Sequence, residues 1–132
     1  MRPRVHAAWL CLAAALAAGC ASEVKRQSVE LAAGQPEQGR RYVTTAAVEA
    51  QPESGYPRSI RAGTEFVAIG RVAAGLVLKP TQTVLTVEGA HVHEAYAVHR
   101  DGQLVGFYLP VERAFAALPQ PVSMPLQEKT SP

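Results

Sequence analysis

An Asp-Gly pair between two alternating runs is the feature that most restricts the fold of this chain. The pair occupies residues 101–102, and the runs 91–100 and 103–109 flank it. Both residue types tolerate positive φ, which the tight turn of a two-residue β-hairpin requires. Because a two-residue loop also fixes the register, the pattern predicts that Arg100 lies opposite Gln103.

The predicted hairpin has two different faces, because side chains alternate along a strand. One face is apolar and is expected to form the core: Val92, Tyr96, Val98, Val105, Phe107 and Leu109. The other face has small residues between imidazole and larger apolar groups, and it is the candidate binding face: His93, Ala95, Ala97, His99, Leu104, Gly106 and Tyr108. Such a trough admits a peptide strand or a ligand, or a second sheet or the C-terminal tail packs into it.

Short β-like runs between turn residues continue through the rest of residues 41–118. Further candidate strands are 42–49, 64–72, 76–79 and 82–88. No run is long and regular enough for a major helix. Only Val111, Phe115 and Leu118 recur at helical spacing, and they predict a short C-terminal helical turn. The predicted fold class is therefore all-β: a small, partly open barrel or a curled antiparallel sheet of five to six strands.

The first twenty residues form a separate segment. Arg2 and Arg4 precede an apolar run over residues 7–18. A helix of that length spans roughly 18 Å, well short of a hydrocarbon core of ~30 Å. The segment therefore predicts a secretory signal peptide rather than a membrane-spanning helix.

The end of this segment indicates which kind of signal it is. Leu16-Ala17-Ala18-Gly19-Cys20 resembles the lipobox of bacterial lipoproteins, with Leu16 one place further from the cysteine than is usual. The resemblance implies cleavage before Cys20, which then carries a diacylglycerol thioether and an N-acyl chain such as palmitate. Two or more acyl chains give stable membrane anchoring.

Ala21 and Ser22, rather than an aspartate, follow Cys20. By the same resemblance, the protein is expected on the outer membrane, facing the periplasm. The alternatives are a soluble secreted protein that is cut after Ala21 and an uncleaved membrane anchor.

The length of 132 residues is sufficient for one domain. We expect residues 1–19 to be the cleaved signal peptide and residues 20–40 to be the lipidated cysteine with a flexible polar tether. A flexible tether of this length has a reach of roughly 25 Å. Residues 41–118 are expected to form the β domain. Residues 119–132 are Pro-rich and are expected to be an extended or disordered tail, or a docking segment for a partner.

Charge and cysteine usage exclude several functions. The formal net charge of +2 becomes zero when Arg2 and Arg4 are removed with the signal peptide. No basic patch is then left to bind nucleic acid. Cys11 also leaves with the signal peptide and Cys20 is acylated, so the mature chain is expected to have no thiol chemistry and no cysteine metal site.

His91 and His93 are the candidate metal ligands. Residues i and i+2 of a strand point the same way, so both imidazoles can reach one metal ion. His99 lies roughly 20 Å further along the strand and cannot easily join them. A third ligand must come from elsewhere, and the alternative is two histidines on a solvated face.

No catalytic constellation is found. Ser54, Ser59 and Ser123 lack a nucleophile-elbow pattern, and Asp101 lies in the predicted turn. No cofactor is expected. We therefore expect a non-enzymatic binding or accessory subunit of a cell-envelope assembly, held at the membrane by its lipid, with an envelope protein or a cell-wall polymer as partner. The alternatives are a soluble or anchored periplasmic metal-binding protein that uses His91 and His93, and a small hydrolase.

Overall fold

The computed structural model describes residues 23–130. The predicted signal peptide, Cys20 and residues 131–132 lie outside the described residues. Within the described range the chain is all-β, as predicted, and it contains no helix. None of its elements is therefore a helix that could cross a bilayer.

The described residues form twelve strands. In chain order they are β1 (Gln27–Ser28), β2 (Arg41–Thr44), β3 (Val48–Ala50), β4 (Arg58–Ile60), β5 (Glu65–Val72), β6 (Gly75–Pro80), β7 (Thr86–Glu88), β8 (Val92–Glu94), β9 (Tyr96–Arg100), β10 (Gln103–Leu109), β11 (Ala114–Ser123) and β12 (Leu126–Glu128).

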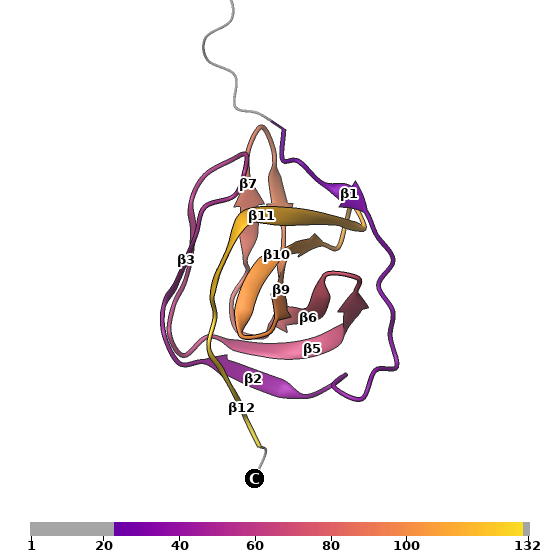
Figure 1. Ribbon diagram of the computed structural model, residues 1–132, viewed down its shortest axis with the longest axis vertical. Helices are drawn as coiled ribbons and strands as arrows, with labels where there is room; N and C mark the ends of the chain where they lie inside the picture. The colour runs from indigo at the N-terminus through magenta and orange to yellow at the C-terminus, as the bar shows by residue number, and fades with distance from the viewer. Residues whose placement is uncertain (1–22, 131–132) are drawn as a thin grey trace, which may run out of the picture.

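Eight of these strands form one antiparallel sheet, in the order β1-β11-β10-β9-β6-β5-β2-β12. Strands β3–β4 and β7–β8 form two separate small hairpins. The large sheet curls, so that β11 crosses the upper part of the view and β5 and β2 cross the lower part (Figure 1). After β11 the chain passes to the opposite edge of the sheet, where β12 pairs with β2. The sheet is therefore curled but not closed, with more strands than the five to six predicted.

The hairpin of β9 and β10 confirms the prediction from the Asp-Gly pair. Asp101 and Gly102 have φ values of 50° and 77°. Arg100 lies opposite Gln103, and His99 lies opposite Leu104. The turn therefore sets the register of the first two pairs as the sequence indicates.

Beyond Leu104 the predicted register is wrong, because β10 contains a β-bulge. The sequence places Val105 opposite Val98, whereas Gly106 occupies that position in the structure. A bulge inserts one extra residue, and every later side chain then points to the other face. Leu104 and Phe107 consequently point to the same face.

Two apolar clusters result, on opposite faces of this part of the sheet. The larger one joins the sheet to the β3–β4 and β7–β8 hairpins; its members include Phe66, Leu78, Val87, Ala95, Ala97, Leu104, Phe107, Leu109 and Met124. The smaller one consists of Val72, Val77, Val98, Tyr108 and Phe115. The predicted core face is thus divided between the clusters, and its first member, Val92, is 66% exposed.

The predicted C-terminal helical turn is not present. A turn over residues 110–113 leads directly into β11, and Arg113 has a φ of 52°. Val111 is exposed, while Phe115 and Leu118 are buried in a strand. Pairing of β11 with β10 satisfies the backbone here, so the helical spacing of these three side chains has no structural counterpart.

The sequence assigns residues 119–132 to an extended or disordered tail, but residues 119–123 belong to β11 and residues 126–128 to β12. The ladder between β10 and β11 is interrupted across residues 118–121, which include Pro119 and Pro121. Proline is tolerated at such an interruption because it has no N–H to contribute. Pairing resumes at Val122 and Ser123.

Residues 23–40, which the sequence assigns to a flexible tether, lie along the folded domain. Val24 is 4% exposed and belongs to the larger cluster. Strand β1 pairs with β11, and Ala32 forms a bridge with Arg71. Val29 and Leu31 cover the smaller cluster. These three apolar side chains, spaced along an otherwise polar segment, explain why it packs against the sheet.

Candidate functional site

The predicted binding face lies inside the protein. Ala95, Ala97 and Leu104 have no exposed area, and Tyr108 is buried as well. Side chains from the β3–β4 and β7–β8 hairpins, such as Ile60 and Val87, fill the space in front of the first three. A second layer of strands therefore occupies the trough, which was the alternative interpretation.

Position 106 needs glycine because the ring of Phe115 occupies the space that a side chain would take. A Cβ atom on Gly106 would lie 2.6 Å from two ring atoms of Phe115 and 2.5 Å from the carbonyl oxygen of Ala116. Glycine here allows the Phe115 ring of β11 to cross the backbone of β10. The small residues of this hairpin thus serve close packing.

His99 is partly buried at the end of β9. Its Nε2–H donates a hydrogen bond to the carbonyl oxygen of Met124 at 3.0 Å. Burial lowers the pKa of His99, and this effect outweighs the opposing contributions of the Met124 hydrogen bond and the Asp101 charge. Neutral His99 therefore joins β9 to the segment between β11 and β12.

The two candidate metal ligands lie close together but in different environments. The ring centroids of His91 and His93 are 6.5 Å apart and meet edge-on. His91 is exposed and lies 3.3 Å from a carboxylate oxygen of Glu23. His93 is buried, with its Nδ1 2.7 Å from Oε1 of Glu112. Each imidazole thus already contacts a carboxylate.

The contact with His93 helps to lower the pKa of the Glu112 carboxyl. Burial alone would raise the pKa of its carboxyl, but the His93 hydrogen bond, a backbone hydrogen bond and the charges of His93 and Arg26 together lower it. Nε2 of His93 and Oε2 of Glu112 are buried without a hydrogen-bond partner among residues 23–130. In the same range, no group of three or more His, Cys, Asp or Glu side chains is arranged to hold a metal ion.

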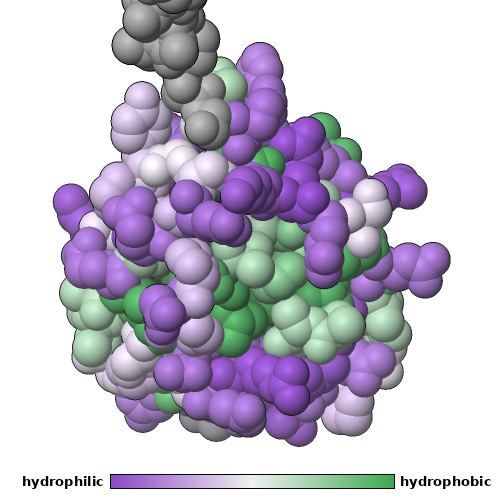
Figure 2. Space-filling view, turned by 45° about the horizontal axis from the view of Figure 1, so that its top comes forward, coloured by the Kyte–Doolittle hydropathy of each residue, from purple (hydrophilic) through white to green (hydrophobic). Residues whose placement is uncertain are grey.

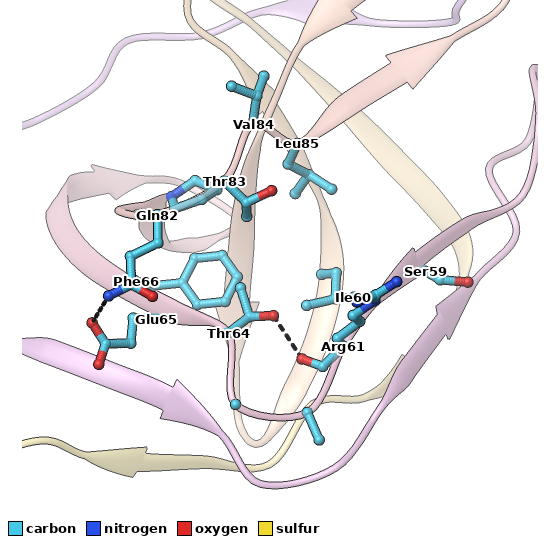
Figure 3. Close-up of a pocket in the computed structure, with 13 residues that line it drawn as sticks. Ser59, Ile60, Arg61, Thr64, Glu65, Phe66, Gln82, Thr83, Val84 and Leu85 are labelled. Atoms are coloured by element: carbon cyan, nitrogen blue, oxygen red, sulfur yellow. Dashed lines mark hydrogen bonds between the residues drawn. The ribbon is translucent and has the colours of Figure 1, made fainter.

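A groove lies between the β4–β5 turn and the loop that joins β6 to β7. Its volume is about 510 Å³. The side chains of Ile60, Phe66 and Leu85 point toward its middle (Figure 3). Val84, on the loop, also lines it and is 74% exposed. We define this site as the β4–β7 groove.

The rim of the β4–β7 groove is polar. Gln82 Nε2 donates to Oε2 of Glu65 at 3.3 Å, and Lys129 contacts the other carboxylate oxygen of Glu65. Arg61 is exposed and takes part in no ion pair among the described residues. The rim therefore offers one free cation and hydrogen-bonding groups around an apolar floor, an arrangement suited to an extended ligand with apolar and anionic groups.

Thr44 of β2 holds the turn that forms one wall of the groove. Its buried Oγ1 donates to the carbonyl of Arg61 at 2.8 Å and accepts from the N–H of Thr64 at 2.9 Å. Its carbonyl also accepts a hydrogen bond from Gly63. One buried side chain thus fixes the conformation of residues 61–64.

The loop that joins β3 to β4 carries Tyr56. Tyr56 is 56% exposed, so its ring does not serve as a buried cap. Its backbone N–H donates to the carbonyl of Glu88 in β7.

The face shown in Figure 2 carries apolar residues near its middle, and hydrophilic residues surround them.

Comparisons with protein families, with curated proteins and with solved structures find no match to this chain.

The β4–β7 groove was not predicted. The sequence pattern predicts a strand over residues 82–88, whereas β7 begins at Thr86 and residues 82–85 lie in the loop that lines the groove. The alternation of polar and apolar residues over 82–85 resembles that of a strand. The local signals near the groove are Pro80, the last residue of β6, and Gly63, which has a φ of 82° in the β4–β5 turn.

Proposed function

We propose that this protein is a lipid-anchored envelope lipoprotein that acts as a non-enzymatic binding or accessory subunit of a cell-envelope assembly. The observation that carries the proposal is the position of Cys20. This residue ends the lipobox-like sequence, and only three residues separate it from Val24, which is part of the folded core. The anchor on the outer membrane, facing the periplasm, and the binding domain thus adjoin directly.

The β4–β7 groove is the surface that best supports a binding role. It has an apolar floor, a polar rim and a free guanidinium at Arg61. A carboxylate-bearing peptide or cell-wall polymer has the chemistry to occupy it. The partner that we propose is therefore an extended segment of an envelope protein or of a cell-wall polymer.

The anchor is tested by Cys20→Ser in the full chain. We expect the variant to lack the acyl mass and to be absent from the outer-membrane fraction. Cys11→Ser is the matched control, since Cys11 lies in the part of the signal peptide that is removed; it should behave as wild type. Intact mass of the membrane-extracted protein reads both the cleavage site and the acyl load. Unchanged mass and fractionation of Cys20→Ser would refute the anchor.

The groove is tested by pull-down from detergent extracts of native envelopes. Arg61→Glu and Val84→Asp should lose a partner that wild type enriches. Arg100→Glu is the matched control, because Arg100 is also exposed but does not line the groove. Purified cell-wall polymer as a second bait source distinguishes a polymer from a protein partner. Equal enrichment by all variants would exclude the groove as the binding surface.

Metal binding by His91 and His93 is the second candidate. The observation in its favour is the orphan Nε2 of buried His93, with the His91 ring close by. Equilibrium dialysis of the purified protein against Zn²⁺ or Cu²⁺ tests it. Equal metal uptake by the double variant His91→Ala, His93→Ala would end this candidate.

A further inference from the structure

The described chain begins at one end of the molecule, beside the tip of the β7–β8 hairpin, and β12 lies at the opposite end (Figure 1). Hydrogen bonds and ion pairs place residues 23–25 at this end. The backbone N–H of Lys25 donates to Oγ of Ser54 at 3.0 Å, and Glu23 lies 3.3 Å from His91. We call this region, with the turn over residues 110–113, the chain-start end.

The chain-start end cannot move far from Cys20. Four residue-to-residue steps join Cys20 to Val24, and Val24 is packed in the core. A fully extended chain covers at most ~14 Å in four residues. The free tether of roughly 25 Å that the sequence suggested is therefore absent, because residues 24–40 are bound to the sheet.

Exposed apolar side chains gather at the same end. Four large hydrophobic residues are exposed in the described chain: Tyr56, Val84, Val92 and Val111. Val84 lines the β4–β7 groove, and the other three belong to the chain-start end. Tyr56 is bonded to Glu88 of β7, Val92 follows His91, and Val111 precedes Glu112, which contacts His93. Tyrosine is favoured in the headgroup region of a bilayer, and exposed apolar side chains gain free energy when they leave water at the boundary with the acyl chains.

Most acidic groups at this end contact a basic side chain. Glu23 lies 3.7 Å from Arg26, and Glu53 contacts Lys25 at 3.1 Å. Glu112 is bonded to His93, as described above. Glu94, two residues after Val92, is exposed and takes part in no ion pair among the described residues, so the negative charge that faces anionic headgroups is reduced but not cancelled.

We infer that the chain-start end of the acylated protein lies against phospholipid headgroups, with Tyr56, Val92 and Val111 at the interface and no spacer between domain and bilayer. The inference rests on the proposed lipid anchor and adds the orientation of the domain. The β12 end, which lies near the β4–β7 groove through the pairing of Thr44 with Leu126, then points away from the membrane.

The test uses the full chain, purified with its acyl groups and reconstituted into vesicles of phosphatidylethanolamine and phosphatidylglycerol. Val92→Cys or Val111→Cys is labelled with a fluorophore, and a headgroup-attached spin label serves as quencher. Val84→Cys is the matched control of equal residue type and exposure, and Gln127→Cys reports the β12 end. We expect several-fold stronger quenching at positions 92 and 111 than at 84 and 127.

The outcomes separate the inference from the proposed function. Equal quenching at all four positions on vesicle-bound protein would overturn the orientation and leave the anchor intact. Failure of the acylated protein to bind vesicles would overturn the anchor and the orientation together. A flexible ten-residue Gly/Ser insertion between Ser22 and Glu23 should keep vesicle binding and abolish the contrast. Persistence of the contrast in that variant would show that the short connection does not set the orientation, contrary to the inference.

Discussion

At the scale of single residues, the neighbour across the strand decides which residue is tolerated. Gly106 does not provide a ligand trough; it makes room for the ring of Phe115 and for the Ala116 carbonyl. His99 does not face a ligand either; it reaches the carbonyl of Met124. Both residues were selected from the sequence as binding residues, and both serve the packing of β9, β10 and the segment after β11.

Gly106→Ala should destabilise the protein by about 1–3 kcal/mol, because the added methyl overlaps a backbone oxygen and an aromatic ring. The shift of the denaturant midpoint measures this loss. The double variant Gly106→Ala, Phe115→Leu should show a smaller loss than the two single variants predict together, since leucine vacates part of the space. Strict additivity would contradict the proposed overlap.

His99→Gln should reduce the pH dependence of stability. Burial lowers the pKa of His99 in the folded protein below its ordinary value of 6.5, so the unfolded chain takes up a proton more readily. The stability that neutral His99 contributes is full above pH 6.5 and is lost as pH falls through the folded pKa. Glutamine keeps an N–H donor but does not titrate.

Thermal unfolding of wild type and His99→Gln between pH 7.5 and 5 measures the difference. The wild-type midpoint should fall more steeply in this window. His91→Gln is the control, because His91 is exposed. If His91→Gln flattened the profile as much as His99→Gln, burial of His99 would not be the cause.

At the scale of elements, one strand often holds another element in place. Thr44 of β2 fixes the β4–β5 turn with its Oγ1, and the β9–β10 turn contacts the segment between β11 and β12, where the N–H of Met124 donates to the carbonyl of Gly102. Such contacts join residues that are distant in sequence. The contacts of Thr44 keep the wall of the β4–β7 groove in one conformation.

Thr44→Val should cost about 1–3 kcal/mol, because the carbonyl of Arg61 and the N–H of Thr64 lose a buried partner while the side-chain volume is kept. Hydrogen exchange of the Thr64 amide should also accelerate. Thr45→Val is the control: Thr45 is exposed, and its hydroxyl contacts the Pro125 carbonyl only at 3.5 Å. Equal losses of stability in the two variants would argue against a role of the Thr44 hydroxyl in holding residues 61–64.

The sequence predicts where strands occur better than it predicts which segments pack against them. The β9–β10 hairpin was predictable because both its turn and its alternation are local signals. The bulge after Leu104 was not predicted; its one local signal is Gly106, because glycine inside a strand often marks a bulge. The predicted binding face became core because the β3–β4 and β7–β8 hairpins pack on Ala95, Ala97 and Leu104. The groove was not predicted because its two walls, residues 61–64 and 82–85, lie apart in the sequence, and Thr44 of β2 holds the first of them.

At the scale of the whole molecule, the folded unit is larger than the region 41–118 that composition suggests. Residues 23–40 cover the smaller cluster and add β1 to one edge of the sheet. Residues 119–128 extend β11 and add β12 to the other edge. The first segment is polar and the second is rich in proline, so neither composition predicts a folded segment. Each nevertheless contains a few apolar side chains that pack against the sheet.

A chain that starts at Arg41 should therefore be much less stable than one that starts at Glu23. Burial of a Val or Leu side chain contributes about 1.5–3 kcal/mol, and the shorter chain loses Val24, Val29 and Leu31. We expect a loss of several kcal/mol, read from the thermal or denaturant midpoint. Equal midpoints for the two chains would mean that residues 23–40 act as a tether after all.

The two open margins of the large sheet have a further consequence. One margin is β1, with two residues, and the other is β12, with three. Unpaired strand margins are templates on which a second copy can add, and brevity is a common protection against such growth. Molecules that share the surface of one bilayer meet far more often than molecules in bulk solution. If the proposed lipid anchor holds, the short outer strands limit what a neighbouring copy could pair with, and the longer free edge is that of β11, which β1 covers only at Ala114 and Phe115.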